Sequence, residues 1–317
     1  MSARKPLDTQ AVALMLLLCT IWALQQIAVK AGAVDMAPLL QIGLRSGISA
    51  VLLALLMAYR GERVLWRDGA WRPGALAGAL FGLEFLVVGE GLRHTSASHM
   101  VVFLYTAPIF AALGLHWRLR AEALRPLQWA GIAVAFGGIA WAFLGRGTSG
   151  AAVGDNPLLG DALGLLGGAA WGATTVAIRC SRLSSAPATE TLLYQLVGGC
   201  VLALAGALAF GQMSFTLTPR LLGNLAFQSI VVSFASYLAW CWLLRRYLAS
   251  RLGVFSFLTP LIGVGAGVVL LGEPLEPAFV QGALLVLAGI VLVSGHAWVA
   301  QALTALRART LGKPRGI

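Results

Sequence analysis

Residues 97–108, ASHMVVFLYTAP, decide the fold because the chain repeats them at residues 249–260 as ASRLGVFSFLTP. These two copies align at an offset of 152 residues. The alignment continues at an offset of 151 residues, from AEALRPLQWAGIAVAFGGI at 121–139 to GEPLEPAFVQGALLVLAGI at 272–290. Because both offsets are close to half of the 317 residues, they indicate a duplication of nearly the whole chain.

The composition predicts surroundings made mostly of lipid. Charged residues are 11% of the chain, against roughly 25% in soluble domains. Apolar residues are 59%, and the mean hydropathy is +0.83. The net charge of +11 is spread over short gaps between apolar runs rather than gathered into a basic domain. This distribution argues against nucleic acid as a partner and is typical of membrane topology signals.

Ten apolar segments are long enough to cross the hydrocarbon core, which needs about 20 residues. They cover residues 10–30, 37–58, 73–92, 96–116, 127–145, 159–179, 190–210, 222–244, 252–271 and 278–300. The gaps between them are too short for a soluble domain, and the longest is a Gly-rich stretch at 146–158. The expected fold class is therefore an all-α polytopic membrane protein with ten transmembrane helices.

The distribution of basic residues predicts the orientation. Of the 23 Lys and Arg residues, 18 lie at the two termini and in the gaps after the even-numbered segments. Four lie in the gaps after the odd-numbered segments, and Arg45 lies inside the second segment. Because basic residues are enriched on the cytoplasmic side, we expect both termini in the cytoplasm.

The duplication predicts two repeats of opposite orientation, at residues 1–148 and 149–317. Trp22-Ala23 in the first segment aligns with Trp171-Gly172 in the sixth, so each half contains five segments. Because five is odd, the second half enters the membrane from the opposite side. Inverted repeats of this kind are typical of secondary transporters, whose substrate site lies near the midplane between the repeats.

These features together resemble a known family. The ten segments, the repeat, TSAS at 95–98 and GEPL at 272–275 resemble EamA-type exporters of the drug/metabolite transporter (DMT) superfamily. The resemblance implies export of small metabolites such as amino acids by alternating access, across a bacterial-type inner (plasma) membrane. The aromatic amino-acid exporter of that family has Trp at the positions of Trp22 and Trp171 and Tyr at that of Tyr105. Ala107 stands where that exporter has a second aromatic residue.

Glu84 is the sharpest single candidate for function. It lies in the middle of the third segment, in FGLEFLVVGEG, with no other charge within five residues. A carboxylate at this depth costs free energy unless it faces a cavity or a partner. We therefore consider it a proton carrier or a ligand for a substrate ammonium group. The alternative is a structural carboxylate that pairs with Arg45 or accepts hydrogen bonds from hydroxyl groups.

Aromatic and proline residues predict the walls of a central substrate site. Trp22 and Trp171 lie midway along their segments, away from the interfaces where Trp usually anchors a helix. Pro108 and Pro260 free the carbonyl groups four residues earlier, and interrupted backbone of this kind lines cavities in transporters. Helix packing and simple kinks are the alternatives. The predicted substrate-binding residues are Trp22, Glu84, Phe85, Tyr105, Trp171, Tyr237, Trp240 and Ser256.

Three further polar residues lie nearer the outer face. Arg45 and Glu90 are at comparable depth on neighbouring segments, so the simpler interpretation is an ion pair between them. The alternative is a charged outer gate that the substrate touches. His99 could relay protons, because histidine titrates near neutral pH. A satisfied polar contact at the membrane interface is the simpler interpretation for His99.

The remaining motifs concern helix packing and the classes of protein that the sequence argues against. Glycines at four-residue spacing, such as Gly74, Gly78 and Gly82, predict closely packed helices. No G-K-S/T phosphate loop, metal-ligand spacing or nucleophile–base pair is present in the sequence, so we expect no ATP use, no cofactor and no enzyme. The expected partners are a small-molecule substrate and the lipid bilayer, with proton coupling and uncoupled facilitation both open.

Overall fold

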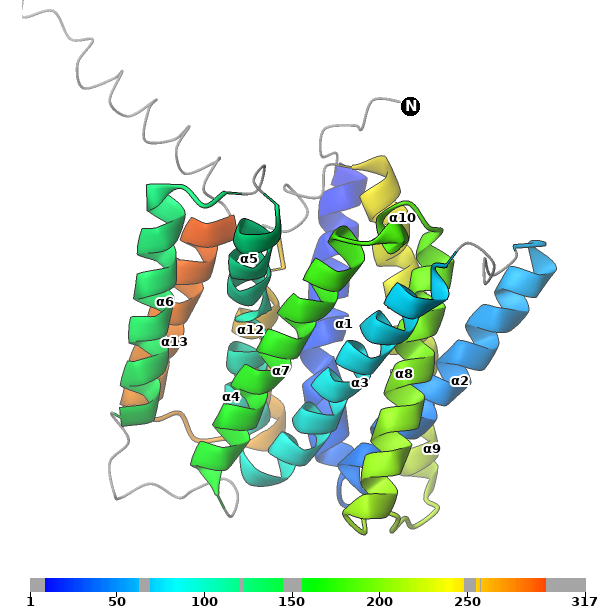
Figure 1. Cartoon of the computed structure of the whole chain (residues 1–317). Coiled ribbons are helices and arrows are strands. Elements are labelled where there is room, and N and C mark those ends of the chain that lie inside the picture. Colours follow the sequence, from blue (N-terminus) through cyan, green and yellow to red (C-terminus); the bar gives the residue numbers. More distant parts are fainter. Residues whose placement is uncertain are drawn as a thin grey trace, which may run out of the picture.

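Helices make up the regular structure in the part of the chain that the computed structural model describes, residues 9–62, 69–119, 123–144, 156–247, 255–256 and 258–294. The elements are α1 (Thr9–Gly32), α2 (Pro38–Tyr59), α3 (Trp71–His94), α4 (Ala97–Leu104), α5 (Ala107–Arg118), α6 (Pro126–Leu144), α7 (Pro157–Arg179), η3 (Arg182–Ser184), α8 (Ala188–Ala209), α9 (Pro219–Ala226), η4 (Phe227–Ser236), α10 (Tyr237–Arg246), α12 (Leu258–Leu271) and α13 (Pro277–Ser294). Figure 1 shows them as a bundle of tilted helices, with α3 and α7 crossing in front of α1.

Seven stretches of helix are long and apolar enough to cross a membrane. They are α1, α2, α3, the pair α4–α5, α7, α8 and the run from α9 into α10. Three further apolar helices, α6, α12 and α13, are shorter over their described parts. At 1.5 Å per residue, the 24 residues of α1 extend about 36 Å, more than the hydrocarbon core of about 30 Å. The expected class, an all-helical multi-pass membrane protein, is confirmed.

Helix starts follow from residues that satisfy the first free N–H groups. Ser96, Asn156 and Thr218 cap α4, α7 and α9, and each side-chain oxygen accepts a bond from the backbone N–H three residues later. Proline occupies the first turn of α7 and α9, where its missing N–H has no cost. These local features set where the chain enters each helix.

The helix at 97–118 is broken just before its proline. α4 ends at Leu104 and α5 begins at Ala107, so Tyr105 and Thr106 lie between two helices. The carbonyl group of Phe103 accepts bonds from the backbone N–H and the side-chain hydroxyl of Thr106. The proline therefore produces two helices rather than a bent one, and Tyr105 lies at the junction.

Close contacts at glycines hold the helices together, as their spacing predicts. A methyl group on Gly198 of α8 would overlap the carbonyl group of Gly78 in α3. On α6, a methyl group on Gly138 would lie 2.7 Å from the carbonyl oxygen of Gly282 in α13. Only residues without a side chain allow two backbones to approach this closely.

The helix contacts correspond between the two halves of the chain. α3 packs against α7 and α8, and η4, at the matching place in the second half, packs against α1 and α2. α4 and α5 pack on α7, while α12 packs on α1. α2 packs on α8, and α6 packs on α13 at one edge of the molecule. In Figure 1, α1 starts at the end of the molecule near the N-terminus, whereas α7 starts at the opposite end.

One stretch has a winding that the sequence did not indicate. η4 is a ten-residue π-helix, with hydrogen bonds from residue i to residue i+5, between α9 and α10. Ser49 of α2 donates a hydrogen bond of 2.8 Å to the carbonyl oxygen of Ser229 within it. Because π-helices are rare and cluster at functional sites, η4 marks this segment as a place of interest.

Candidate substrate site

Charged and aromatic side chains from both halves gather inside the helical bundle. The first half contributes residues from α1, α2, α3 and the α4–α5 junction, and the second half contributes residues from α7 and α10. We call this group the central cluster; its members are Trp22, Gln25, Arg45, Glu84, Phe85, Tyr105, Trp171, Tyr237 and Trp240.

Glu84 lies deep inside the protein without a direct partner for one of its oxygens. Its residue is 4% exposed, and its Oε2 atom is buried with no hydrogen-bond partner. No ion pair within 4.0 Å reaches its carboxylate from any residue that the structure describes. A buried carboxylate in a membrane helix marks a functional position or a path for ions.

Arg45 lies beside Glu84 without forming an ion pair with it. The residue is 1% exposed, and its Nε and Nη1 atoms have no hydrogen-bond partner. Its guanidinium group lies over the ring of Phe85, 4.6 Å from the ring centroid. Glu84 and Tyr237 are its electrostatic neighbours. The structure thus places Arg45 in the central cluster.

Trp22 and Trp240 form one aromatic wall of the cluster. Their rings meet edge to face, with centroids 5.6 Å apart. The Nε1 atom of Trp22 donates a 2.9 Å hydrogen bond to the hydroxyl of Ser236, the last residue of η4. This bond fixes the orientation of the indole ring of Trp22 against the second half of the chain. Both tryptophan side chains remain half-buried.

Tyr105 and Trp171 form a second aromatic pair, again between the two halves. Their ring centroids are 5.2 Å apart at an interplanar angle of 89°. Tyr105 lies at the α4–α5 junction and is an electrostatic neighbour of Glu84 and Tyr237. The hydroxyl of Tyr237 is 3.4 Å from the Oε1 atom of Gln25, to which it donates. These contacts connect the aromatic pairs to the two charges.

The second proline and Ser256 behave differently from their counterparts in the first half. Pro260 is buried near the start of α12, whereas Pro108 is only half-buried. We expected the carbonyl group of Ser256 to be free, but it accepts a 3.1 Å bond from the N–H of Thr259. That expectation is wrong because the chain closes a turn there.

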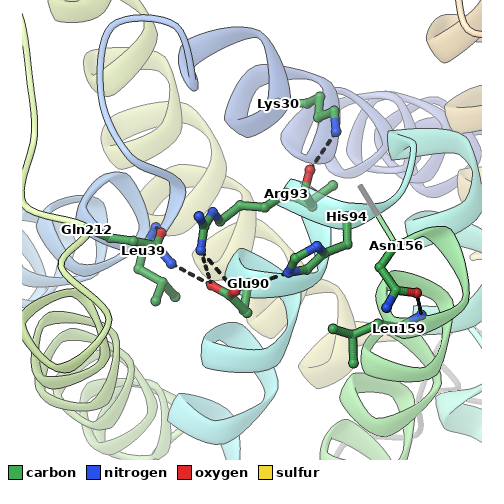
Figure 2. Close-up of polar contacts among 9 residues, drawn as sticks. Lys30, Leu39, Glu90, Arg93, His94, Asn156, Leu159 and Gln212 are labelled. Atoms are coloured by element: carbon green, nitrogen blue, oxygen red, sulfur yellow. Dashed lines mark hydrogen bonds and ion pairs between the residues drawn. The ribbon is translucent and has the colours of Figure 1, made fainter. Parts of the chain in front are cut away.

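Glu90 belongs to a different set of contacts (Figure 2). Its carboxylate lies 2.9 Å from Arg93 and 3.2 Å from His94, one turn further along α3. Gln212 donates a hydrogen bond to it from the loop after α8. The predicted ion pair between Arg45 and Glu90 is therefore wrong. Glu90 instead pairs with residues three and four positions later on its own helix.

His99 makes a specific polar contact. Its Nδ1 atom lies 3.0 Å from the Oδ2 atom of Asp161 in α7, and its ring stacks on Phe279 with centroids 3.6 Å apart. Thr95 also donates to Asp161. The structure thus gives His99 a buried polar contact that joins α4 to α7.

Glu273 has a structural role that we did not predict from the sequence. Its carboxylate accepts bonds from the N–H groups of Ala97 and Ser98, at 2.7 and 3.0 Å, and from the Ser98 hydroxyl at 2.6 Å. It therefore caps the N-terminus of α4 from the loop between α12 and α13. Ala97 and Ser98 lie in the repeated stretch 97–108, and Glu273 lies in the repeated stretch 272–290, so this recurrence was the available signal.

A surface groove of about 380 Å³ lies elsewhere, between α2 and α8. Its lining consists of Gly43, Leu44, Gly47, Ile48, Val51, Leu52, Cys200 and Leu204. None of these residues belongs to the central cluster. Within the described ranges, no group of three His, Cys, Asp or Glu side chains is placed to hold a metal ion.

Comparison with known proteins places the chain among transporters. The sequence matches the EamA-like transporter family over residues 9–144 and again over 158–295. The "Uncharacterized transporter YoaV" of Bacillus subtilis (strain 168) is 23% identical over 274 residues, which cover 86% of this chain and 92% of that protein. The "Uncharacterized inner membrane transporter YedA" of Escherichia coli (strain K12) is 27% identical over 270 residues, 81% of each protein.

One relative has a name that includes a substrate class. The "Probable amino-acid metabolite efflux pump" of Salmonella typhimurium is 26% identical over 298 residues, which cover 88% of this chain and 93% of that protein. A solved crystal structure has a similar fold, with a TM-score of 0.63 at 19% identity, covering 97% of this chain and 100% of that chain.

Proposed function

Because this chain belongs to the EamA-like transporter family, we propose that it is a secondary transporter that exports small metabolites, in particular amino acids. The central cluster carries this proposal. Glu84 is a buried carboxylate in a membrane helix, and its electrostatic neighbours include Tyr105 from the first half of the chain and Tyr237 from the second. Binding sites for small molecules combine apolar and aromatic walls with a few placed polar groups in this way.

The proposed mechanism is alternating access between two inverted five-helix repeats, residues 1–148 and 149–317, with ten spans in total. The correspondence of helix contacts between the halves supports this arrangement. The opposite starting ends of α1 and α7 also support it (Figure 1). The aromatic pairs Trp22–Trp240 and Tyr105–Trp171 join the halves, so movement of one repeat against the other would open the cluster.

The proposed setting is a bacterial-type inner membrane with both termini in the cytoplasm. The excess of basic residues at the termini and in alternate gaps supports this orientation. The inner-membrane relative YedA supports the location. The relative named as an efflux pump supports export as the direction of transport.

Glu84 is the proposed coupling residue, and proton exchange at its carboxylate is the proposed source of energy. The titratable groups near it are Arg45, Tyr105 and Tyr237. An uncoupled facilitator for small amphipathic solutes is the second candidate. The central cluster would serve either one, because both need a solute site between two gates.

Purified protein in liposomes tests the proposal. We expect uptake or counterflow of labelled amino acids, driven by an imposed pH gradient, and a large decrease in that movement for Glu84→Gln. The control is Glu276→Gln, which removes a carboxylate outside the cluster whose Oε2 atom has no hydrogen-bond partner. Transport by Glu84→Gln with unchanged rate and pH dependence would remove Glu84 from the mechanism. Transport without any response to pH would favour the uncoupled facilitator.

A further inference from the structure

The central cluster contains two opposite charges that do not neutralise each other directly. Arg45 and Glu84 are 1% and 4% exposed, and the atoms Arg45 Nε, Arg45 Nη1 and Glu84 Oε2 lack hydrogen-bond partners. In the described structure no carboxylate lies within 4.0 Å of Arg45. Leaving buried charged groups without hydrogen bonds costs more free energy than leaving neutral ones.

The Phe85 ring compensates for only part of this cost. A cation over an aromatic face is attracted by the negative face of the ring, but the ring accepts no hydrogen bond in the guanidinium plane. That interaction leaves the N–H groups at the edge of the guanidinium plane free to donate. Guanidinium donors match carboxylates in planar geometry and charge, so a carboxylate is the ligand that Arg45 fits best. Glu84 fits an ammonium group in the complementary way.

We infer that Arg45 and Glu84 together recognise a zwitterion, with the carboxylate of the substrate on Arg45 and its ammonium group on Glu84. This inference rests on the proposed function and names the feature that selects its substrates. A substrate with an ammonium group and a carboxylate attached to the same carbon would bridge Arg45 and Glu84, whose buried atoms lack hydrogen-bond partners. The Tyr105–Trp171 pair then offers an aromatic surface for the substrate side chain.

The competing explanation is structural. In that case Arg45 balances the negative charge of Glu84 without direct contact. The substrate then does not contact the guanidinium group of Arg45. The two explanations differ in one measurable way. Recognition of a zwitterion makes each charged residue responsible for one end of the ligand, whereas a structural pair affects all ligands alike.

Four probes separate the two ends: phenylalanine, phenethylamine, phenylalaninamide and N-acetylphenylalanine. Phenethylamine and phenylalaninamide lack the carboxylate, and N-acetylphenylalanine lacks the ammonium group. Liposomes that contain the full chain are loaded with phenylalanine. Each probe then competes with labelled phenylalanine for counterflow. We expect wild-type protein to bind phenylalanine about 10- to 100-fold more tightly than the other three, from the strength of hydrogen bonds to charged groups.

The variants assign each end. We expect Arg45→Gln to weaken the binding of phenylalanine by about 10- to 100-fold. The affinity for phenethylamine should stay within about twofold of the wild-type value. Glu84→Gln should weaken the binding of phenethylamine and leave the affinity for N-acetylphenylalanine unchanged. Arg45→Lys keeps the charge and should recover part of the affinity. Thermal unfolding of each variant checks that it is folded, and the wild-type series decides the matter if Arg45→Gln does not fold.

The results that overturn the inference differ from those that overturn the proposed function. Equal weakening of all four probes by Arg45→Gln would make Arg45 structural, and so would unchanged affinity for phenylalanine in the folded variant. Equal wild-type affinity for the four probes would also overturn the inference while leaving amino-acid transport intact. A wild-type protein that moves none of the four would overturn the inference together with the proposed amino-acid substrate class.

Discussion

Replacing Glu273 by Gln should loosen the contact between the α12–α13 loop and the start of α4. Three donors converge on this carboxylate, two backbone N–H groups and one hydroxyl. An amide has one acceptor oxygen in place of two. Whichever way the Gln side chain turns, its NH2 group faces a backbone N–H, so at least one N–H group at the N-terminus of α4 loses its partner.

The expected cost follows from these bonds. An unpaired buried N–H costs about 1–3 kcal/mol, and each remaining bond loses the gain of a charged acceptor, about 1 kcal/mol. The favourable interaction of a negative charge with a helix N-terminus, about 0.3–1 kcal/mol, is lost as well. We therefore expect Glu273→Gln to lower the free energy of unfolding by about 2–6 kcal/mol, the sum of these contributions.

Two measurements check this value. Unfolding of the purified protein in detergent gives the free energy difference, with Glu276→Gln as the matched control three residues away. For that control we expect a change below about 1 kcal/mol, because the Oε2 atom of Glu276 has no hydrogen-bond partner to lose. Hydrogen exchange reports the local effect, and we expect faster exchange of the Ala97 and Ser98 amides in Glu273→Gln only.

Two variants of equal stability, together with unchanged exchange at Ala97 and Ser98, would refute this role of Glu273. Such a result would mean that the three bonds to Glu273 contribute nothing beyond what water supplies. A stability loss without faster exchange at α4 would place the effect of Glu273 elsewhere in the protein.

Three other predictions concern separate contacts. Gly198→Ala forces a methyl group into the backbone of Gly78 and should cost about 3 kcal/mol or more in a detergent unfolding assay, whereas Gly137→Ala, which meets nothing within 4 Å, should gain up to about 1 kcal/mol. Trp171→Ala should reduce amino-acid counterflow at least about tenfold through loss of the Tyr105 pair; unchanged counterflow would remove the pair from the site. Glu90→Gln should leave the counterflow rate within about twofold, because its partners lie outside the central cluster.

Hydropathy and glycine spacing predicted most of the helical framework. The segment expected at 10–30 is the helix Thr9–Gly32, because a lipid-facing helix must be apolar over its whole length. The spacing of Gly78 and its neighbours predicted the close approach to α8, because only glycine permits it. These features depend on single helices or on local spacing, so one sequence is enough to find them.

The site was harder to predict, because it depends on which face of each helix points inward. Arg45 and Glu90 were matched by depth alone, yet depth says nothing about direction around the helix axis. Arg45 lies over the ring of Phe85, and Glu90 takes Arg93 and His94 as partners. Glu84 itself was found because a lone carboxylate within a membrane helix is costly wherever it points.

The π-helix η4 sets the direction in which two site residues face. Tyr237 begins α10 directly after η4, and Trp240 lies one turn later. A helix with hydrogen bonds from i to i+5 holds an extra residue in each turn relative to an α-helix. Each residue added to or removed from an α-helix rotates the next part of the helix by about 100°. The winding of η4 therefore determines the rotation of α10 about its axis. This rotation decides whether the aromatic face of α10 contacts Trp22 or points into the lipid.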